Sequence, residues 1–243
     1  MHGSSLDVNS SNTAGFFGKL PGFSDFLSRR IPRTFLEPWD SWLQQGMTSS
    51  RERLGVSWLD TYLTSPIWRF LLVPGVCGSN GWAGVFMPSV DRVGRHFPFT
   101  LAADLEREGG LAIVADSGWF DRLEQLALSA LDEPFDIEVF DACLKRLGLP
   151  SSPDVPLSKL KGAQNDALSW CFGLASLESL RGSLPAIAES LLDDKLQRHT
   201  YWWTSGSEKV KPCLLTCRGL PSAASFAGLL DGNWSRWGLA IWL

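Results

Sequence analysis

The chain has 243 residues, of which 44% are hydrophobic, and its 22 Lys and Arg against 26 Asp and Glu give a formal net charge of −4. This length and composition allow a substantial buried core in one or two domains. The acidic balance argues against general nucleic-acid binding, which needs a basic surface that displaces counterions. The 5 cysteines are odd in number and widely spaced, which is typical of reduced thiols in a cytoplasmic protein.

Residues 1–13 are polar and contain no apolar segment of the kind found in a signal peptide, so we expect a disordered leader there. No apolar run approaches the roughly 18 residues that a membrane span needs. The sequence therefore predicts a cytoplasmic protein without membrane insertion.

The first predicted element is a short strand and turn at residues 15–20, and residues 25–30 are expected to form a single helical turn. Apolar residues recur at helical spacing over residues 35–47, which predicts an amphipathic helix. Pro38 suits only the first turn of a helix, so we place the start of this helix close before it. A second helix is predicted at residues 57–63.

Short apolar runs bounded by turn residues then predict strands. They lie at residues 68–73, 82–87, 97–102 and 111–115. These runs do not alternate between apolar and polar residues, which favours a sheet with helices on both faces. Two amphipathic helices follow, at residues 117–131 and 136–147, and Gly148 is predicted to end the second.

Residues 148–158 are the one linker-like stretch, rich in Pro, Gly and Ser. Beyond it we predict strands at residues 169–173, 199–204, 213–217 and 237–243, and helices at residues 187–196 and 222–230. These helices are too few to cover their own strands, so we expect one continuous sheet from both halves of the chain. The predicted fold class is α/β: a three-layer, single domain over residues 14–243, with a mixed sheet covered by helices on both faces.

Familiar catalytic and metal-binding motifs do not fit this sequence. The segment GFFGK at residues 15–19 has the wrong glycine spacing for a phosphate-binding loop, and no Gly-x-Ser-x-Gly elbow occurs. Three donors for a metal can be drawn from His199, Cys213 and Cys217. Structural zinc sites usually show two pairs of ligands, however, and only one pair is present. We therefore predict no metal and no cofactor.

The stretch MPSVDRVGRHFPF at residues 87–99 carries the densest group of polar residues between two predicted strands: Asp91, Arg92, Arg95 and His96. One interpretation is a hairpin connection whose charges pair locally. The other is a partner-binding loop, because Arg side chains held by rigid strands suit acidic groups. On the second interpretation we predict a partner-binding surface made by Lys19, Asp25, Arg29, Asp91, Arg92 and Arg95, projecting from turns at Gly22 and Gly94.

Three motifs in order resemble the TagF family. They are GFFGKLPGFSDFLSRRIPRTFLEPWDSWLQQGM at residues 15–47, GWAGVFMPSVDRVGRHFPFTL at residues 81–101 and YWWT at residues 201–204. The resemblance covers residues 14–243, with one departure: Ser24 stands where the family motif has glycine before Asp-Phe. It implies an α/β fold and an accessory protein of the bacterial type VI secretion system that represses the apparatus post-translationally, through the forkhead-associated scaffold protein Fha. The resemblance carries over no catalytic residue.

The leading hypothesis is thus a repressor that binds a secretion component stoichiometrically and is not an enzyme. Two alternatives stay open at this point. One is an enzyme of hydrolase-like activity that uses Asp91 and His96 as acid and base. The other is a structural component of the secretion apparatus.

Overall fold

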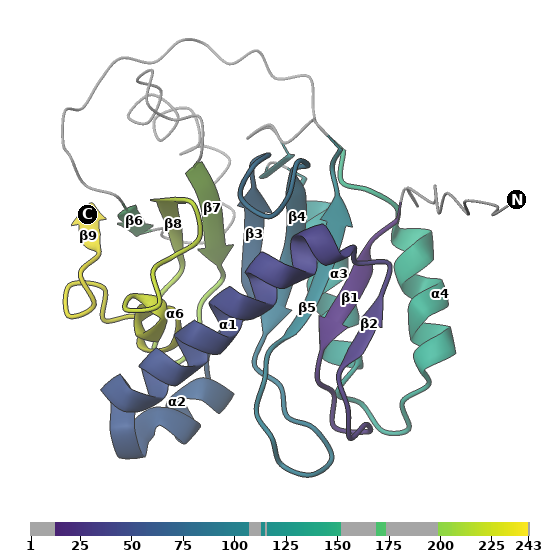
Figure 1. Cartoon of the computed structure of the whole chain (residues 1–243), viewed down its shortest axis with the longest axis horizontal. Helices are drawn as coiled ribbons and strands as arrows, with labels where there is room; N and C mark the ends of the chain where they lie inside the picture. The colour runs from purple at the N-terminus through teal and green to yellow at the C-terminus, as the bar shows by residue number, and fades with distance from the viewer. Residues whose placement is uncertain (1–12, 107–112, 115, 152–168, 174–198, 243) are drawn as a thin grey trace, which may run out of the picture.

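The computed structural model describes residues 13–106, 113–114, 116–151, 169–173 and 199–242. These residues form a 9-stranded sheet with the strand order β2-β1-β5-β4-β3-β7-β8-β6-β9 (Figure 1). The strands are β1 (Gly15–Gly18), β2 (Leu27–Arg29), β3 (Trp68–Leu72), β4 (Trp82–Met87), β5 (Phe99–Asp104), β6 (Ser169–Gly173), β7 (His199–Thr204), β8 (Cys213–Arg218) and β9 (Ala240–Trp242). Neighbouring strands are antiparallel, except that β6 and β9 are parallel.

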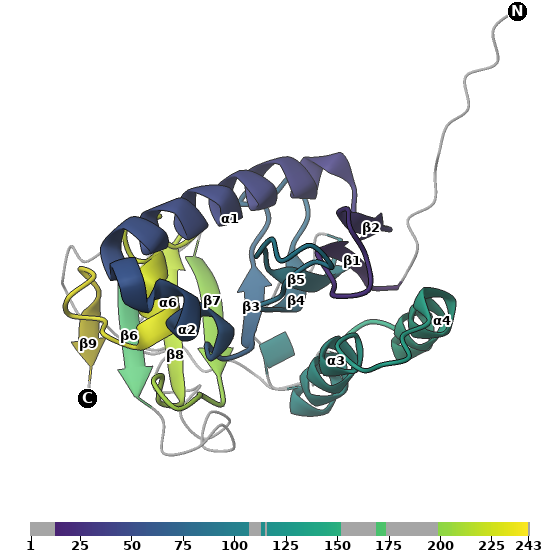
Figure 2. The same ribbon diagram turned by 90° about the horizontal axis from the view of Figure 1, so that it is seen from below.

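The helices lie on the two faces of this sheet. They are α1 (Arg33–Leu54), the short 3-10 helix η1 (Gly55–Ser57), α2 (Trp58–Leu63), α3 (Ser117–Ser129), α4 (Ile137–Leu147) and α6 (Phe226–Asp231). Figure 2 shows α1, α2 and α6 on one face, while α3 and α4 lie on the other. The α/β class is confirmed. The helix expected at residues 187–196 lies outside the described residues, so helical cover of both faces along the whole sheet stays a prediction.

The core beneath α1 is dominated by aromatic side chains. Trp39 is fully buried and stacks on Trp202 of β7, with ring centroids 5.8 Å apart. Trp42 donates its indole N–H to the carbonyl oxygen of Pro221 at 2.7 Å, a residue 179 positions later. A buried tryptophan needs such a partner for its single N–H. The N-terminal helix is therefore fixed by residues from the other end of the chain.

The two halves of the chain share the sheet through β3 and β7. These strands pair antiparallel, with Arg69 opposite Trp203 and Leu72 opposite Thr200. The expectation of one continuous sheet is confirmed, because the ladder runs without interruption from strands of the first half to strands of the second. A single domain over residues 14–243 stays a prediction.

The segment between β1 and α1 differs from the expected helical turn. Leu27–Arg29 form β2, which pairs with β1 so that Leu27 lies opposite Gly18. The helix α1 begins at Arg33, earlier than predicted, and includes Pro38 in its interior. The expectation was wrong because tertiary packing outweighed the proline rule: Phe35, ahead of the proline, is fully buried.

Other differences concern the ends of elements. The strand expected at residues 111–115 is not formed at Ile113 and Val114, which are in 3-10 helical conformation, and the other three residues lie outside the described residues. The helix α3 is capped by Asp116, whose Oδ1 accepts the Trp119 N–H at 3.1 Å. By contrast, Gly148 ends α4 as predicted, with a φ of 67° that few other residues adopt.

Candidate protein-interaction surface

The connection between β4 and β5, residues 88–98, folds back on itself as a closed loop, referred to here as the 88–98 loop. An isolated bridge joins Val90 to His96, and the Asp91 N–H donates to the Arg95 carbonyl at 3.0 Å. Gly94 sits at the tip with a φ of 85°, a conformation that strains residues with a side chain. The prediction of a tight connection at Gly94 is confirmed.

The carboxylate of Asp91 organises this loop from inside. Its Oδ1 accepts the backbone N–H groups of Val93 and Arg95 at 3.0 and 2.8 Å, and its Oδ2 accepts Lys19 Nζ at 2.9 Å and Arg95 Nε at 2.7 Å. Burial alone would raise the pKa of Asp91, but these hydrogen bonds outweigh burial and hold the pKa well below its ordinary value. Asp91 therefore remains ionised and fixes the backbone of the loop.

Lys19 and Asp91 are not surface groups, which corrects the expectation that all six charged residues project from the protein. Lys19 is 6% exposed and Asp91 is 3% exposed. The two charges are buried together because each compensates the other, and an isolated buried charge would be strongly unfavourable. They tie the end of β1 to the 88–98 loop.

The outer side of the loop is exposed and lies against the β1–β2 turn, residues 19–26. Arg92 donates from its side chain to the Ser24 hydroxyl at 2.9 Å and from its backbone N–H to the Phe23 carbonyl at 2.9 Å. The guanidinium of Arg95 donates to the Ser24 carbonyl oxygen. The Ser24 hydroxyl thus provides a side-chain contact between the turn and the loop.

Two apolar side chains accompany these arginines. Val93 at the tip is 63% exposed, and Phe26 on the turn is 48% exposed. Phe26 stacks on Phe17, with ring centroids 5.6 Å apart, and the Lys19 ammonium lies 5.0 Å from its centroid. Four of the exposed side chains on the loop and the turn make up what we call the loop surface: Phe26, Arg92, Val93 and Arg95.

The remaining predicted residues are placed differently. Asp25 is exposed on the same turn. Arg29 lies at the other end of β2, where its guanidinium donates to Glu138 of α4 at 2.9 Å and lies 3.3 Å from Asp141. Arg29 therefore holds α4 against the edge of the sheet and is not joined to the loop surface. Sequence reasoning missed Phe26 and Val93, although an apolar residue beside charged ones in a turn was a visible signal.

His96 packs among aromatic rings. Its ring is perpendicular to those of Trp58 and Tyr62, with centroids 5.7 and 5.8 Å away. Burial and the nearby positive charge of Arg51 lower the pKa of His96.

Within the searched, described residues there is no group of three or more His, Cys, Asp or Glu that could hold a metal ion. Cys213 and Cys217 are both buried, and burial raises the pKa of the Cys217 thiol to about 12. Among the helices in the described ranges, none is long and apolar enough to cross a membrane.

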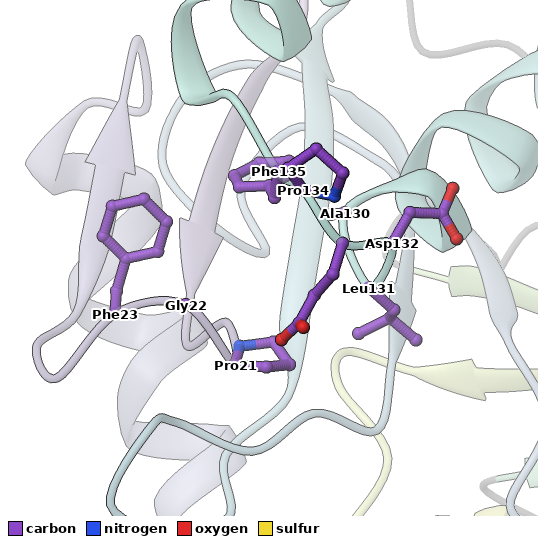
Figure 3. Close-up of a pocket in the computed structure, with 9 residues that line it drawn as sticks. Pro21, Gly22, Phe23, Ala130, Leu131, Asp132, Pro134 and Phe135 are labelled. Atoms are coloured by element: carbon purple, nitrogen blue, oxygen red, sulfur yellow. The ribbon is translucent and has the colours of Figure 1, made fainter.

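A second surface feature lies on the other side of the β1–β2 turn (Figure 3). It is an open groove of about 460 Å³ between residues 21–23 of the turn and residues 130–135, which connect α3 to α4. Sequence reasoning did not identify it. Both walls could be predicted as turns, from Pro21-Gly22 and from Pro134. The sequence does not indicate that these two segments, more than 100 positions apart, lie next to each other.

Fold and surface together define the class: an α/β protein built on a largely antiparallel sheet, with a charged loop held by a buried ion pair. The family follows from the sequence. Residues 15–147 match the family described as TagF N-terminal domain, type VI secretion system-associated. The chain belongs to the TagF family, which confirms the resemblance of its motifs, and it is a type VI secretion-associated protein.

A solved structure supports the fold. The crystal structure of PA0076 from Pseudomonas aeruginosa PAO1 is 38% identical, with a TM-score of 0.71 over 91% of this chain and 95% of that chain. An oleoyl thioesterase structure from Lactobacillus plantarum, at 8% identity over 88% of this chain and 99% of that chain, reaches a TM-score of 0.17, and nothing is concluded from it. No curated protein sequence matches this chain.

Proposed function

We propose that this TagF protein represses the type VI secretion system post-translationally in the cytoplasm, by stoichiometric binding to a component of the apparatus. The forkhead-associated scaffold protein Fha is the first partner to test, because the resemblance to the family implies it. One structural observation supports binding above all: the loop surface is exposed, yet a buried carboxylate holds the loop beneath it in place.

This arrangement suits recognition of a protein partner. The guanidinium groups of Arg92 and Arg95 offer planar donors for carboxylates, while Val93 and Phe26 offer apolar contacts beside them. Because Asp91 already orders the backbone of the loop, little conformational entropy is lost on binding. The partner segment that fits this surface is acidic with an apolar residue nearby.

The state of Asp91 supports binding over catalysis. A general base needs a free lone pair directed at a substrate. Asp91 already accepts four hydrogen bonds, two from backbone N–H groups and two from side chains. Its role in holding the loop accounts for its burial without a catalytic task.

The test is a titration of expression in cells with an intact secretion cluster. A stoichiometric repressor should reduce secretion in proportion to its molar ratio to the partner. Full repression at trace amounts would instead support the enzyme alternative with Asp91 and His96. Co-purification with the assembled apparatus, at constant copy number, would support a structural component.

A single substitution tests the surface. Arg92→Ala removes an exposed guanidinium that donates a hydrogen bond to the Ser24 hydroxyl. We expect binding to purified Fha, measured by calorimetry, to weaken about tenfold or more, equivalent to roughly 1.4 kcal/mol. The control is Arg33→Ala, which removes the same charge from an exposed pair with Glu37 at the start of α1. Equal affinities of the two variants would contradict this placement.

A further inference from the structure

The groove beside the β1–β2 turn has a mainly apolar lining that comes from two distant segments of the chain. Its apolar residues are Pro21, Phe23, Ala130, Leu131, Pro134 and Phe135. Phe23 and Phe135 meet edge to face across the walls, with ring centroids 6.0 Å apart. Figure 3 shows residues of the turn facing those of the α3–α4 connection across the opening.

Its walls are fixed on both sides. Phe135 packs on Phe140 of α4, which is buried in the core, with ring centroids 5.4 Å apart. On the other wall, the Phe23 N–H donates to the Leu20 carbonyl and the Phe23 carbonyl accepts the Arg92 N–H. The groove is therefore supported by the core and by the 88–98 loop.

The charges at the groove are all of one sign. Asp132 and Glu133 line it, both are exposed, and neither forms an ion pair with a described residue. No Lys or Arg is among its lining residues. Leu131, next to these carboxylates, is 42% exposed, and Leu128 one turn earlier is 49% exposed. Two carboxylates and two exposed leucines thus lie at or next to the apolar residues of the groove.

We propose that this groove docks an extended segment of a partner protein, in which an apolar side chain lies beside Lys or Arg. The apolar side chain contacts the apolar lining residues, and the cation lies against the carboxylates of Asp132 and Glu133. Charge complementarity selects a cationic segment over an acidic one, since an acidic segment would meet two unpaired carboxylates.

The groove and the loop surface flank the same turn with opposite charge. The Arg92 N–H bonds to Phe23, so the two features are in direct contact through the backbone. The groove proposal does not depend on repression or on Fha, because it follows from the lining of the groove alone. A failure of one proposal leaves the other intact.

The experiment uses isotope-labelled full-length protein and three defined tetrapeptides with blocked ends. The probes are Leu-Pro-Lys-Leu, its acidic counterpart Leu-Pro-Glu-Leu, and the cationic but polar Gly-Ser-Lys-Ser. We expect the first peptide to shift the amide signals of Gly22, Leu131 and Asp132 in a saturable manner. The acidic and the polar peptides should bind at least about fivefold more weakly.

A charge-neutral variant identifies the groove as the place of binding. Asp132→Asn with Glu133→Gln keeps the shape of the rim and should weaken the first peptide about fivefold or more. The control, Glu52→Gln with Glu208→Gln, changes the net charge equally at exposed positions outside the groove and should bind as the unaltered protein does.

Three outcomes would overturn the proposal. The first is no saturable shift with any peptide. The second is equal binding of Gly-Ser-Lys-Ser, which would mean general attraction to charge. The third is a dimer in sedimentation that the Asp132 and Glu133 variant dissociates, since a second copy would then be the occupant. The Arg92→Ala protein should bind the first peptide normally, which separates this test from that of the loop surface.

Discussion

The Lys19 ammonium lies 2.9 Å from the Asp91 carboxylate, and the two side chains are 7% and 0% exposed. This ion pair joins the end of β1 to a loop 72 residues later. Buried charges of opposite sign depend on each other, because removal of one leaves the other without compensation in a poorly solvating environment. The ion pair therefore holds the 88–98 loop, and with it the loop surface, in place.

Asp91→Asn should lower the melting temperature clearly, because Lys19 loses its counter-charge and two backbone N–H groups lose a charged acceptor. Circular dichroism during heating would measure this change. The matched control is Asp25→Asn on the exposed turn, which should change stability by no more than about 0.5 kcal/mol. Adding Lys19→Met to Asp91→Asn should restore part of the loss. Equal melting temperatures of the two Asp→Asn variants would refute the supporting role.

Stability should depend on pH through the same carboxylate. The pKa of Asp91 is lowered by folding, so its contribution is fully present above the unfolded-state pKa of about 3.9 and is lost as the pH falls toward the folded-state pKa. The advantage of the unaltered protein over Asp91→Asn should therefore be constant near neutrality and should shrink below about pH 5. Urea unfolding at several pH values would measure it. An advantage that grew on acidification would have the wrong sign.

Close contact between α1 and α6 should make Gly46 intolerant of a side chain. A Cβ at this position would lie 2.3 Å from the ring of Phe226, which is fully buried. Gly46→Ala should reduce the free energy of unfolding by about 1–3 kcal/mol, since overpacking displaces core side chains. Gly22→Ala is the control, because a Cβ there meets nothing within 4 Å. Urea unfolding of both variants would measure this difference. Equal losses in the free energy of unfolding would contradict this account.

The region that matches the family, residues 15–147, should not fold as a separate unit. A fragment of residues 14–147 would expose the edge of β3 that pairs with β7, and Trp39 would lose its stacking partner Trp202. We expect poor dispersion of amide signals from this fragment, and recovery on co-expression with residues 148–243. A fragment that alone gave a cooperative thermal transition would instead indicate two domains.

The elements that sequence predicts well are those with a local cause. Asp136 caps α4 by accepting the N–H groups of Glu138 and Val139, and Gly148 ends that helix with a positive φ. Both effects depend on one or two neighbouring residues. The β2 strand was missed because it has only three residues and is defined by its pairing with β1, which no local periodicity reveals.

In the candidate site, too, the sequence predicts what depends on neighbouring residues and misses what depends on distant contacts. The sequence placed Asp91, Arg92 and Arg95 in one loop, and it placed Lys19, the ion-pair partner of Asp91, in the same predicted surface. It did not show that Lys19 and Asp91 are buried, since burial here follows from the meeting of two segments 72 positions apart. Whether charges lie inside or outside depends on such non-local contacts, and composition carries no information about them.

The hydrogen bond from Trp42 to Pro221 has a consequence for how the protein is made. Its acceptor lies 179 residues after its donor, and at about 5–20 residues per second a ribosome needs roughly 10–40 seconds to add that many. During that interval the aromatic side chains of α1 are already synthesised, but the indole N–H of Trp42 has no native acceptor. For most of the interval Trp202, on which Trp39 stacks, has not been synthesised either. A nascent chain in this condition presents apolar surface that chaperones recognise. We therefore expect the yield of folded protein to depend on protection of this apolar surface during synthesis.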